Sequence, residues 1–430
     1  MINVELSNIW SCVSLPDLLS REKEIFDAHL HLRTNASNEE PCFGWLGQPE
    51  TITARMIHNV RSAAEQIRSM GSTLVVLGSG TAYLGAQAVL DALGGRMRLL
   101  EKRQCRVLFA GDNLSTRDWL ALCRQLEGQD YCLHIISPVG AEMETCVASR
   151  AIRWMMERRY GAETKQRVFV SALPNSPMAV MAAEEGYTLL PMPVQPGGAD
   201  SALTPASFLP MAAAGIDPLA VLEGATEGYR QFDLRAFENP VWMYAGARYA
   251  LSCRGRNLEL FGTFDPGFAP LGRWWRHFCC RHACSDGVGA LPVHADWTAD
   301  LDAMDAMISS GRYALFETMV RFGTISGQKV NIEMDWKDYD GLEYLAEKSL
   351  ADVEEKTYEA LVSTHADGDV PIIALECEAL DAYHMGELLY FLELSGAIYA
   401  CACGIEPFDP TPLKTRELAA QMLGRQEKNV

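Results

Sequence analysis

A glycine turn after an apolar run is the first feature of this sequence that has the form of a binding site. Thr73–Leu77 has the composition of a buried strand, and Gly78-Ser79-Gly80-Thr81 follows it directly. Backbone N–H groups in such a turn, at the start of a helix, can hold a phosphate or another anion. Two glycines are also compatible with a plain tight turn, and the third glycine of the dinucleotide-binding fingerprint is missing from the required offset. Both interpretations stay open on this feature alone.

Histidine and cysteine side chains cluster between residues 277 and 284, in a pattern that disfavours a metal centre. Zinc sites pair ligands two to four residues apart and need a second pair elsewhere. We interpret the cluster as structural thiols and surface histidines, with metal or redox use as the alternative, and we expect no metal and no cofactor. His29 and His31 lie in a helical pattern, where residues two apart point in different directions. The cluster consists of His277, Cys279, Cys280, His282 and Cys284.

The composition excludes several classes of function. The chain has 430 residues, 48% hydrophobic and 22% charged, which is typical of a water-soluble protein of about two domains. A net charge of −19 argues against nucleic acid, which requires clustered cations. We find no signal-peptide pattern and no apolar run of membrane-spanning length. The thirteen cysteines show no disulfide framework, so we predict a cytoplasmic protein with reduced thiols.

The glycine turn belongs to a series of short apolar strands that alternate with longer amphipathic segments. This alternation predicts an α/β fold with two mostly parallel sheets flanked by helices. A second series begins at Leu258–Thr263 and resumes at Pro371–Leu375. The strands expected in the first sheet are Thr73–Leu77, Arg106–Ala110, Tyr131–Ser137, Arg167–Ser171 and Tyr187–Pro191.

The Pro/Gly-rich segment Gln195–Asp200 divides the two series. We predict an N-terminal helical segment over residues 1–50, a first domain over 51–200, a second domain over 201–384 and a helical C-terminal arm over 385–430. Within that arm we expect helices around Met385–Tyr399 and Thr415–Leu423. Both are expected to cover exposed faces or to reach across to a partner.

About ten short motifs occur in the order found in one known family. Leu74–Gly85 is similar to its first phosphate loop, and Glu184–Asp217 to the region around its Gly-Gly-Arg. Over nearly the whole chain the sequence therefore resembles the phosphoglucose (glucose-6-phosphate) isomerase family in its shorter bacterial form. The other matching motifs are Phe43–Leu46, Glu238–Pro240, Trp274-Trp275, Asp300-Leu301, Leu315–Thr318, Asp340–Leu342, Asp367-Gly368 and Pro407–Asp409.

The resemblance implies two sugar isomerase domains with a helical arm, a homodimer, and the interconversion of glucose 6-phosphate and fructose 6-phosphate without a cofactor. That reaction needs donors for a phosphate, a carboxylate that moves a proton between two carbons, and a cation beside the enediolate oxygen. The expected ligand is a small sugar or sugar phosphate. The positions that the resemblance assigns to ligand binding are Gly78, Gly80, Thr81, Ala82, Ser137, Gly140, Gly197 and Gly198.

The sequence departs from the family at most catalytic positions. Arg281 stands where the family has its proton-transferring Glu, and Ala199 where it has the enediolate-stabilising Arg. Asp302 replaces the ring-opening His that the neighbouring subunit supplies, and Glu417 replaces the C-terminal Lys, unless Lys414 or Arg416 takes that place. Glu144 is retained.

The second phosphate loop, Ser137–Glu144, departs as well. Pro138 removes a backbone donor there, and Glu142 adds a negative charge where a phosphate should sit. His282 is a candidate new group beside Arg281.

These substitutions leave three hypotheses. The favoured one is a non-catalytic homologue that binds a ligand or partner, because a general base is worth about 10²–10⁴ in rate and an oxyanion donor about 10²–10³. The second is a diverged isomerase for another substrate that uses Glu144, Arg281, His282 or Asp302. The third is a residual glucose-6-phosphate isomerase.

Overall fold

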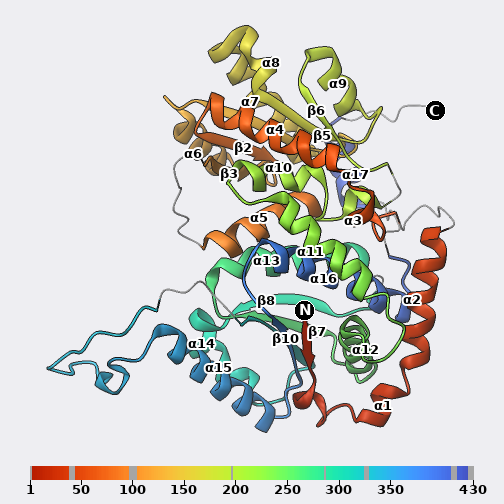
Figure 1. Cartoon of the computed structure of the whole chain (residues 1–430), viewed down its shortest axis with the longest axis vertical. Coiled ribbons are helices and arrows are strands. Elements are labelled where there is room, and N and C mark those ends of the chain that lie inside the picture. The colour runs from red at the N-terminus through yellow and green to blue at the C-terminus, as the bar shows by residue number, and fades with distance from the viewer. Residues whose placement is uncertain are drawn as a thin grey trace.

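Two five-stranded sheets, each with helices on both faces, form the protein (Figure 1). The computed structural model describes residues 2–37, 44–95, 104–194, 197–284, 287–323, 329–407 and 414–424, without the side chains of 35–37 and 414. The predicted α/β class with two mostly parallel sheets is confirmed. Among the described residues, no helix has the length and apolar character needed to cross a membrane.

The first sheet is entirely parallel, in the order β3-β2-β4-β5-β6. All residues of β2 and β4 are buried, because helices cover both faces. Leu74 and Val76 point to one face, and Val75 and Leu77 to the other. The five predicted strands are confirmed, with ends that differ by at most one residue. They are β2 (Thr73–Leu77), β3 (Arg106–Ala110), β4 (Tyr131–Ile136), β5 (Val168–Ala172) and β6 (Thr188–Pro191).

Helices on the two faces of this sheet belong to two hydrophobic clusters. One face carries α4 (Ala54–Met70), α5 (Thr81–Gly94) and α10 (Pro205–Ala213). The other carries α6 (Thr116–Leu126), α7 (Met143–Tyr160) and α9 (Pro177–Glu185), while the short α8 (Thr164–Arg167) leads into β5.

The second sheet has the order β1-β10-β9-β7-β8 and one antiparallel edge. That edge is β1 (Asn3–Glu5), which pairs with β10 (Ile372–Cys377) and lies within a segment that the sequence predicted to be mainly helical. The remaining strands are β7 (Leu258–Thr263), β8 (Leu291–Asp296) and β9 (Leu315–Phe322). On one face lie α14 (Trp297–Ile308) and α15 (Leu350–Asp367), and on the other α12 (Pro240–Cys253), α13 (Ala269–His282) and α16 (Ala382–Ala402).

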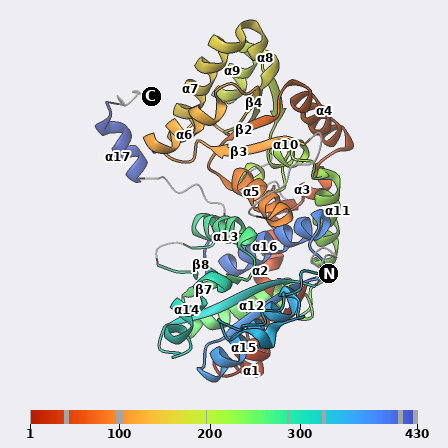
Figure 2. The same ribbon diagram turned by 90° about the vertical axis from the view of Figure 1, so that its left-hand side faces the viewer.

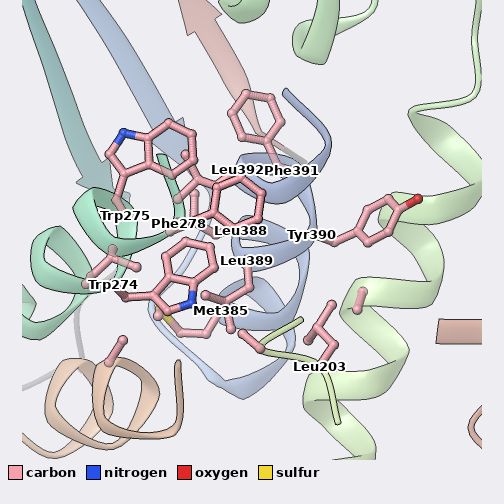
Figure 3. Close-up of a cluster of buried hydrophobic side chains, with 14 of the residues drawn as sticks. Leu203, Trp274, Trp275, Phe278, Met385, Leu388, Leu389, Tyr390, Phe391 and Leu392 are labelled. Atoms are coloured by element: carbon pink, nitrogen blue, oxygen red, sulfur yellow. The ribbon is translucent and has the colours of Figure 1, made fainter. Parts of the chain in front are cut away.

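Helices α5, α11 (Pro218–Gln231), α13 and α16 lie between the two sheets (Figure 1). Trp275 and Phe278 stack with ring centroids 5.8 Å apart, and both face the apolar side chains of α16 (Figure 3). Every residue from Met385 to Ala400 is buried. The expectation that this helix covers an exposed face or reaches to a partner is therefore wrong. Its all-round apolar surface fits a core helix.

The remaining parts of the structure are the helices near the two chain ends and one segment that extends from the second sheet. The N-terminal helices are α1 (Leu15–Leu19), α2 (Glu22–Ser37) and α3 (Gln48–Thr51), and the C-terminal helix is α17 (Lys414–Met422). The segment 329–349 projects away from the second sheet (Figure 1). Two of its aromatic side chains, Trp336 and Tyr339, are 88% and 84% exposed.

Candidate functional site

The glycine turn connects β2 to the N-terminus of α5, as the sequence predicted. Gly80 is the N-cap residue, and no side chain caps the first turn. A side chain at Gly78 would place its Cβ atom 2.9 Å from the ring of Tyr83, so only glycine fits there. Thr81 and Ala82 are buried in the first turn. The backbone N–H groups of this turn remain the feature that could hold an anion.

In the second loop, between β4 and α7, an acidic side chain of the loop binds a hydroxyl group of the same loop. Ser137 is fully buried, and its hydroxyl group donates a hydrogen bond to the Glu142 carboxylate while accepting one from the Gly140 N–H at 3.1 Å. The Pro138 carbonyl accepts from the Leu173 N–H at 2.9 Å. Glu142 occupies the N-cap position of α7 without capping it, since its side chain turns back to Ser137. The hydroxyl group that a ligand would use is therefore already bound.

The third loop runs from Gly197 to Leu203 and is anchored by a buried acid. Gly197 has a left-handed φ of 72°, a conformation that favours glycine. A Cβ atom on Gly198 would lie 3.0 Å from the Cβ of Pro193. Glu393, on α16, accepts a hydrogen bond from the Ala202 N–H at 2.7 Å. Ala199, which the resemblance places at the family's Arg position, is only partly buried and carries no charge.

Asp200 forms an electrostatic cluster with residues of the neighbouring elements. Burial raises the pKa of the Asp200 carboxyl, the Arg281 guanidinium opposes the rise, and the Glu142 carboxylate adds to it. Arg281 is exposed on the last turn of α13, so the third loop, the second loop and α13 meet at this point. The sequence did not single out Asp200, since an acid after two glycines and an alanine has no distinctive pattern.

His282 is buried instead of facing a ligand. It is 3% exposed, and its ring lies 5.2 Å from that of Phe278. Burial lowers the pKa of His282 well below its ordinary value, and Arg281 and His277 add to the effect. The prediction of surface histidines is wrong here, and His282 falls out of the set of groups that can contact a ligand.

Asp302 lies on α14, in the other half of the molecule from α7 (Figure 1). It lines a cavity of about 740 Å³ between α14 and α15, together with Asp305, Lys348 and Lys356. Within one chain, Glu144, His282 and Asp302 therefore do not converge, as a new catalytic group built from them would require.

The C-terminal helix reaches the second loop from the side of the first sheet (Figure 2). Arg416 on α17 forms an ion pair of 2.9 Å with Glu144, in the first turn of α7. Glu417 follows Arg416 on the same helix, whereas the side chain of Lys414 lies outside the described residues. The retained Glu144 is thus engaged by a cation that the sequence placed near this site.

The dense cysteine cluster has the character of structural thiols. Cys279 is buried, and burial raises the pKa of its thiol well above the ordinary value. The Cys284 thiol donates to the Ala290 carbonyl group at 3.2 Å. In the described ranges, no three His, Cys, Asp or Glu side chains are grouped as a metal site would require.

Known proteins resemble this chain over most of its length. Glucose-6-phosphate isomerase of Exiguobacterium sibiricum is 33% identical over 387 residues, which cover 88% of this chain and 86% of the relative. The enzyme of the same name from Heliobacterium modesticaldum is 34% identical over 397 residues, which cover 90% and 88%. A solved glucose-6-phosphate isomerase from Chlamydia trachomatis has the same fold, with a TM-score of 0.78 and 15% identity over 98% of this chain and 88% of that one. No protein-family model matches the sequence.

Proposed function

Because this chain belongs to the glucose-6-phosphate isomerase family, we propose that it is a non-catalytic member that binds a small sugar-like ligand or a partner. The proposed site consists of Gly78–Thr81, Ser137–Glu144 and Gly197–Ser201. One observation carries the proposal: the hydroxyl group of Ser137 donates to the carboxylate of Glu142, within the loop that should hold a phosphate.

Phosphate binding needs donors and positive charge in the loop. Here the Ser137 hydroxyl is bound to Glu142, and Pro138 has no N–H to offer. The Glu142 carboxylate also repels a second anion. Glucose 6-phosphate and fructose 6-phosphate therefore bind weakly, if at all.

Proton transfer lacks both of its expected groups. The Arg281 guanidinium stays protonated in proteins and cannot act as a base. Ala199 provides no cation for an enediolate oxygen. Loss of the general base lowers the rate by about 10²–10⁴, and loss of the oxyanion partner lowers it by about 10²–10³. The two effects on the rate are not additive. Together they leave little of the family's reaction.

A second candidate function, an isomerase for a different substrate, is favoured by Asp200 and Arg281. The partly buried Asp200 carboxyl, whose pKa is raised by burial, interacts with the Arg281 guanidinium. An aldose–ketose isomerase needs an acid–base group and a cation of this kind. Loss of turnover of an unphosphorylated or differently phosphorylated sugar in an Asp200→Asn variant would favour this candidate.

A homodimer and a cytoplasmic location are further proposals. The projecting segment 329–349 exposes Trp336, Tyr339 and Tyr344, which is unusual for a surface in contact with water and typical of an interface. A second copy of the chain is the partner that the family suggests. The cysteines in the described part of the chain are free, which fits a reducing compartment.

Calorimetric titration of the native protein with glucose 6-phosphate, fructose 6-phosphate and inorganic phosphate tests the proposed closure of the second loop. We expect dissociation constants in the millimolar range or weaker. In Glu142→Gln we expect phosphate to bind about tenfold more tightly, because one like charge worth about 1.4 kcal/mol is removed.

The matched control is Glu157→Gln, which removes the same charge from an exposed position about 20 Å further along α7. It should leave phosphate binding unchanged. A micromolar dissociation constant for either sugar phosphate in the native protein would contradict the proposal.

A further inference from the structure

A fully buried acid connects the third loop to the central helix of the molecule. Glu393 lies on α16 and is 1% exposed. Its Oε1 atom accepts from the Ala202 N–H at 2.7 Å, and the Ser201 hydroxyl lies 3.2 Å from Oε1 and 3.0 Å from Oε2. The loop that carries Ala199 and Asp200 is therefore bound directly to a carboxyl group of the core.

The surroundings of this contact fix its geometry. Ser201 Oγ also accepts from the Leu203 N–H at 3.0 Å, and the Gln48 side chain donates to the Leu203 carbonyl at 2.8 Å. Ala202 packs closely on Gly85 of α5. A Cβ atom added to Gly85 would lie 2.5 Å from the Cβ atom of Ala202. Small shifts of the loop would break these contacts together.

The carboxyl group of Glu393 has few charged neighbours. Burial raises its pKa to about 8, the hydrogen bonds from Ala202 and Ser201 oppose the rise, and Asp200 on the loop adds to it. Tyr390, one turn earlier on α16, also interacts electrostatically with Glu393. The Ser201 hydroxyl and the Ala202 N–H both donate to the carboxyl oxygens, whereas burial of the group favours its neutral form.

We propose that Glu393 is a positioning residue that holds the loop Gly197–Leu203 in place while its buried carboxyl group is neutral, so that the loop opens more often as the pH rises. The proposal concerns regulation of the same site. The pH-dependent opening of the loop does not depend on the proposed function. Only its consequence does, namely that a ligand reaches the part of the site formed by Ala199 and Asp200 more easily at high pH.

Linkage gives the sign of this dependence. When the loop opens and Glu393 meets water, its pKa returns toward the ordinary value of 4.5. Between that value and about 8, the closed state keeps a proton that the open state has lost. Each pH unit in this window therefore favours opening by up to about tenfold, and above it the effect levels off.

Hydrogen exchange of the loop, measured on the full chain without ligand at pH 5.5, 6.5 and 7.5, tests the proposal. After correction for intrinsic exchange rates, we expect protection of the 197–204 amides to fall by up to about 100-fold over this range in the native protein. In Glu393→Gln, which keeps the shape but cannot ionise, protection should stay constant within about threefold. A flat native profile would overturn the proposal, whether or not the variant folds.

Two more variants separate the proton from the hydrogen bonds. Glu387→Gln changes another buried acid about 9 Å away on α16 and should keep the native slope. Ser201→Ala should lower protection at every pH and also keep the slope, because Glu393 still titrates. An equal slope in Glu393→Gln would refute the proposal. None of these outcomes depends on a ligand, so they leave the proposed function to its own test.

Discussion

At the scale of single residues, the neighbours of a side chain determine whether it can contact a ligand, as Ser137 and His282 show. Ser137 is one of the residues that the resemblance assigns to ligand binding, yet its hydroxyl group is bound to Glu142. His282 has the right chemistry for catalysis, yet it is buried beside Phe278. Neither fact can be derived from sequence, because each depends on where a neighbouring side chain turns.

His134, beneath the second loop, supplies a prediction at this scale. It is fully buried on β4, hydrogen-bonded to the Ser171 hydroxyl at 2.9 Å, and burial lowers its pKa to about 3. Below pH 6.5 the unfolded chain binds a proton that the folded chain excludes, so stability is lost as the pH falls toward 3.

Urea unfolding at pH 4, 5, 6 and 7 should show this loss. In His134→Gln the slope of the unfolding free energy against pH should be smaller by up to about 1.4 kcal/mol per pH unit. The same slope in both proteins would mean that His134 is not neutral in the fold.

At the scale of elements, the sequence predicted the first sheet well and the second sheet only in part. β2 and β7 match the prediction residue for residue. For β2 the reason is that a strand covered on both faces is a nearly continuous apolar run with clear ends. β1 was missed, since three residues form a strand only by pairing with β10, which lies far along the chain. The apolar surface of α16 on all sides did indicate a buried helix, but its position near the C-terminus suggested an arm.

The candidate site follows the same division. The glycine turn before α5 was predictable, because it is coded by adjacent residues. Glu393 and Asp200 were not, because their roles depend on contacts between α16, the third loop and α13. One signal was available for Glu393, namely an acid within an otherwise apolar helix.

A buried ion pair positions α13, and its removal is the prediction at this scale. Arg248 on α12 and Glu259 on β7 are fully buried and 2.7 Å apart, and the Trp275 indole N–H of α13 lies 3.4 Å from the same carboxylate. Arg248→Ala should lower the unfolding free energy by about 3–5 kcal/mol, because it leaves Glu259 buried without its partner. Chemical denaturation measures this loss.

The control replaces both charges by apolar residues of similar volume. Arg248→Met combined with Glu259→Leu should cost less than Arg248→Ala alone, since no charge remains buried. If the single variant is as stable as the native protein, the pair does not anchor α13.

At the scale of the whole molecule, the candidate site is formed by elements from both halves of the chain. The three loops of the site come from the first half of the sequence, and α13, α16 and α17 come from the second half, with α17 beside the first sheet (Figures 1 and 2). Arg273 of α13 also pairs with Asp112, which follows β3, at 2.6 Å. The division into domains near residue 200 stays a prediction, but the site depends on both halves.

Assembly is the prediction at this scale. We expect light scattering at micromolar concentration to give twice the chain mass of 47.5 kDa. Replacing Trp336 and Tyr339 by Ala should shift the mass toward one chain, because the exposed segment then loses most of its apolar contact area. Surface variants elsewhere, such as Glu157→Gln, should leave the mass unchanged. A single-chain mass for the native protein would contradict the homodimer.

The central claim is that this family member does not interconvert glucose 6-phosphate and fructose 6-phosphate. A coupled assay of the native protein with both sugar phosphates tests it directly, beside the double variant Arg281→Glu with Ala199→Arg. We predict no turnover above the uncatalysed background in the native protein, and none in the double variant while Glu142 still closes the second loop. Native turnover of about 1 s⁻¹ or more, within the ordinary range for enzymes, that is abolished by Glu144→Gln or Asp200→Asn would contradict the account.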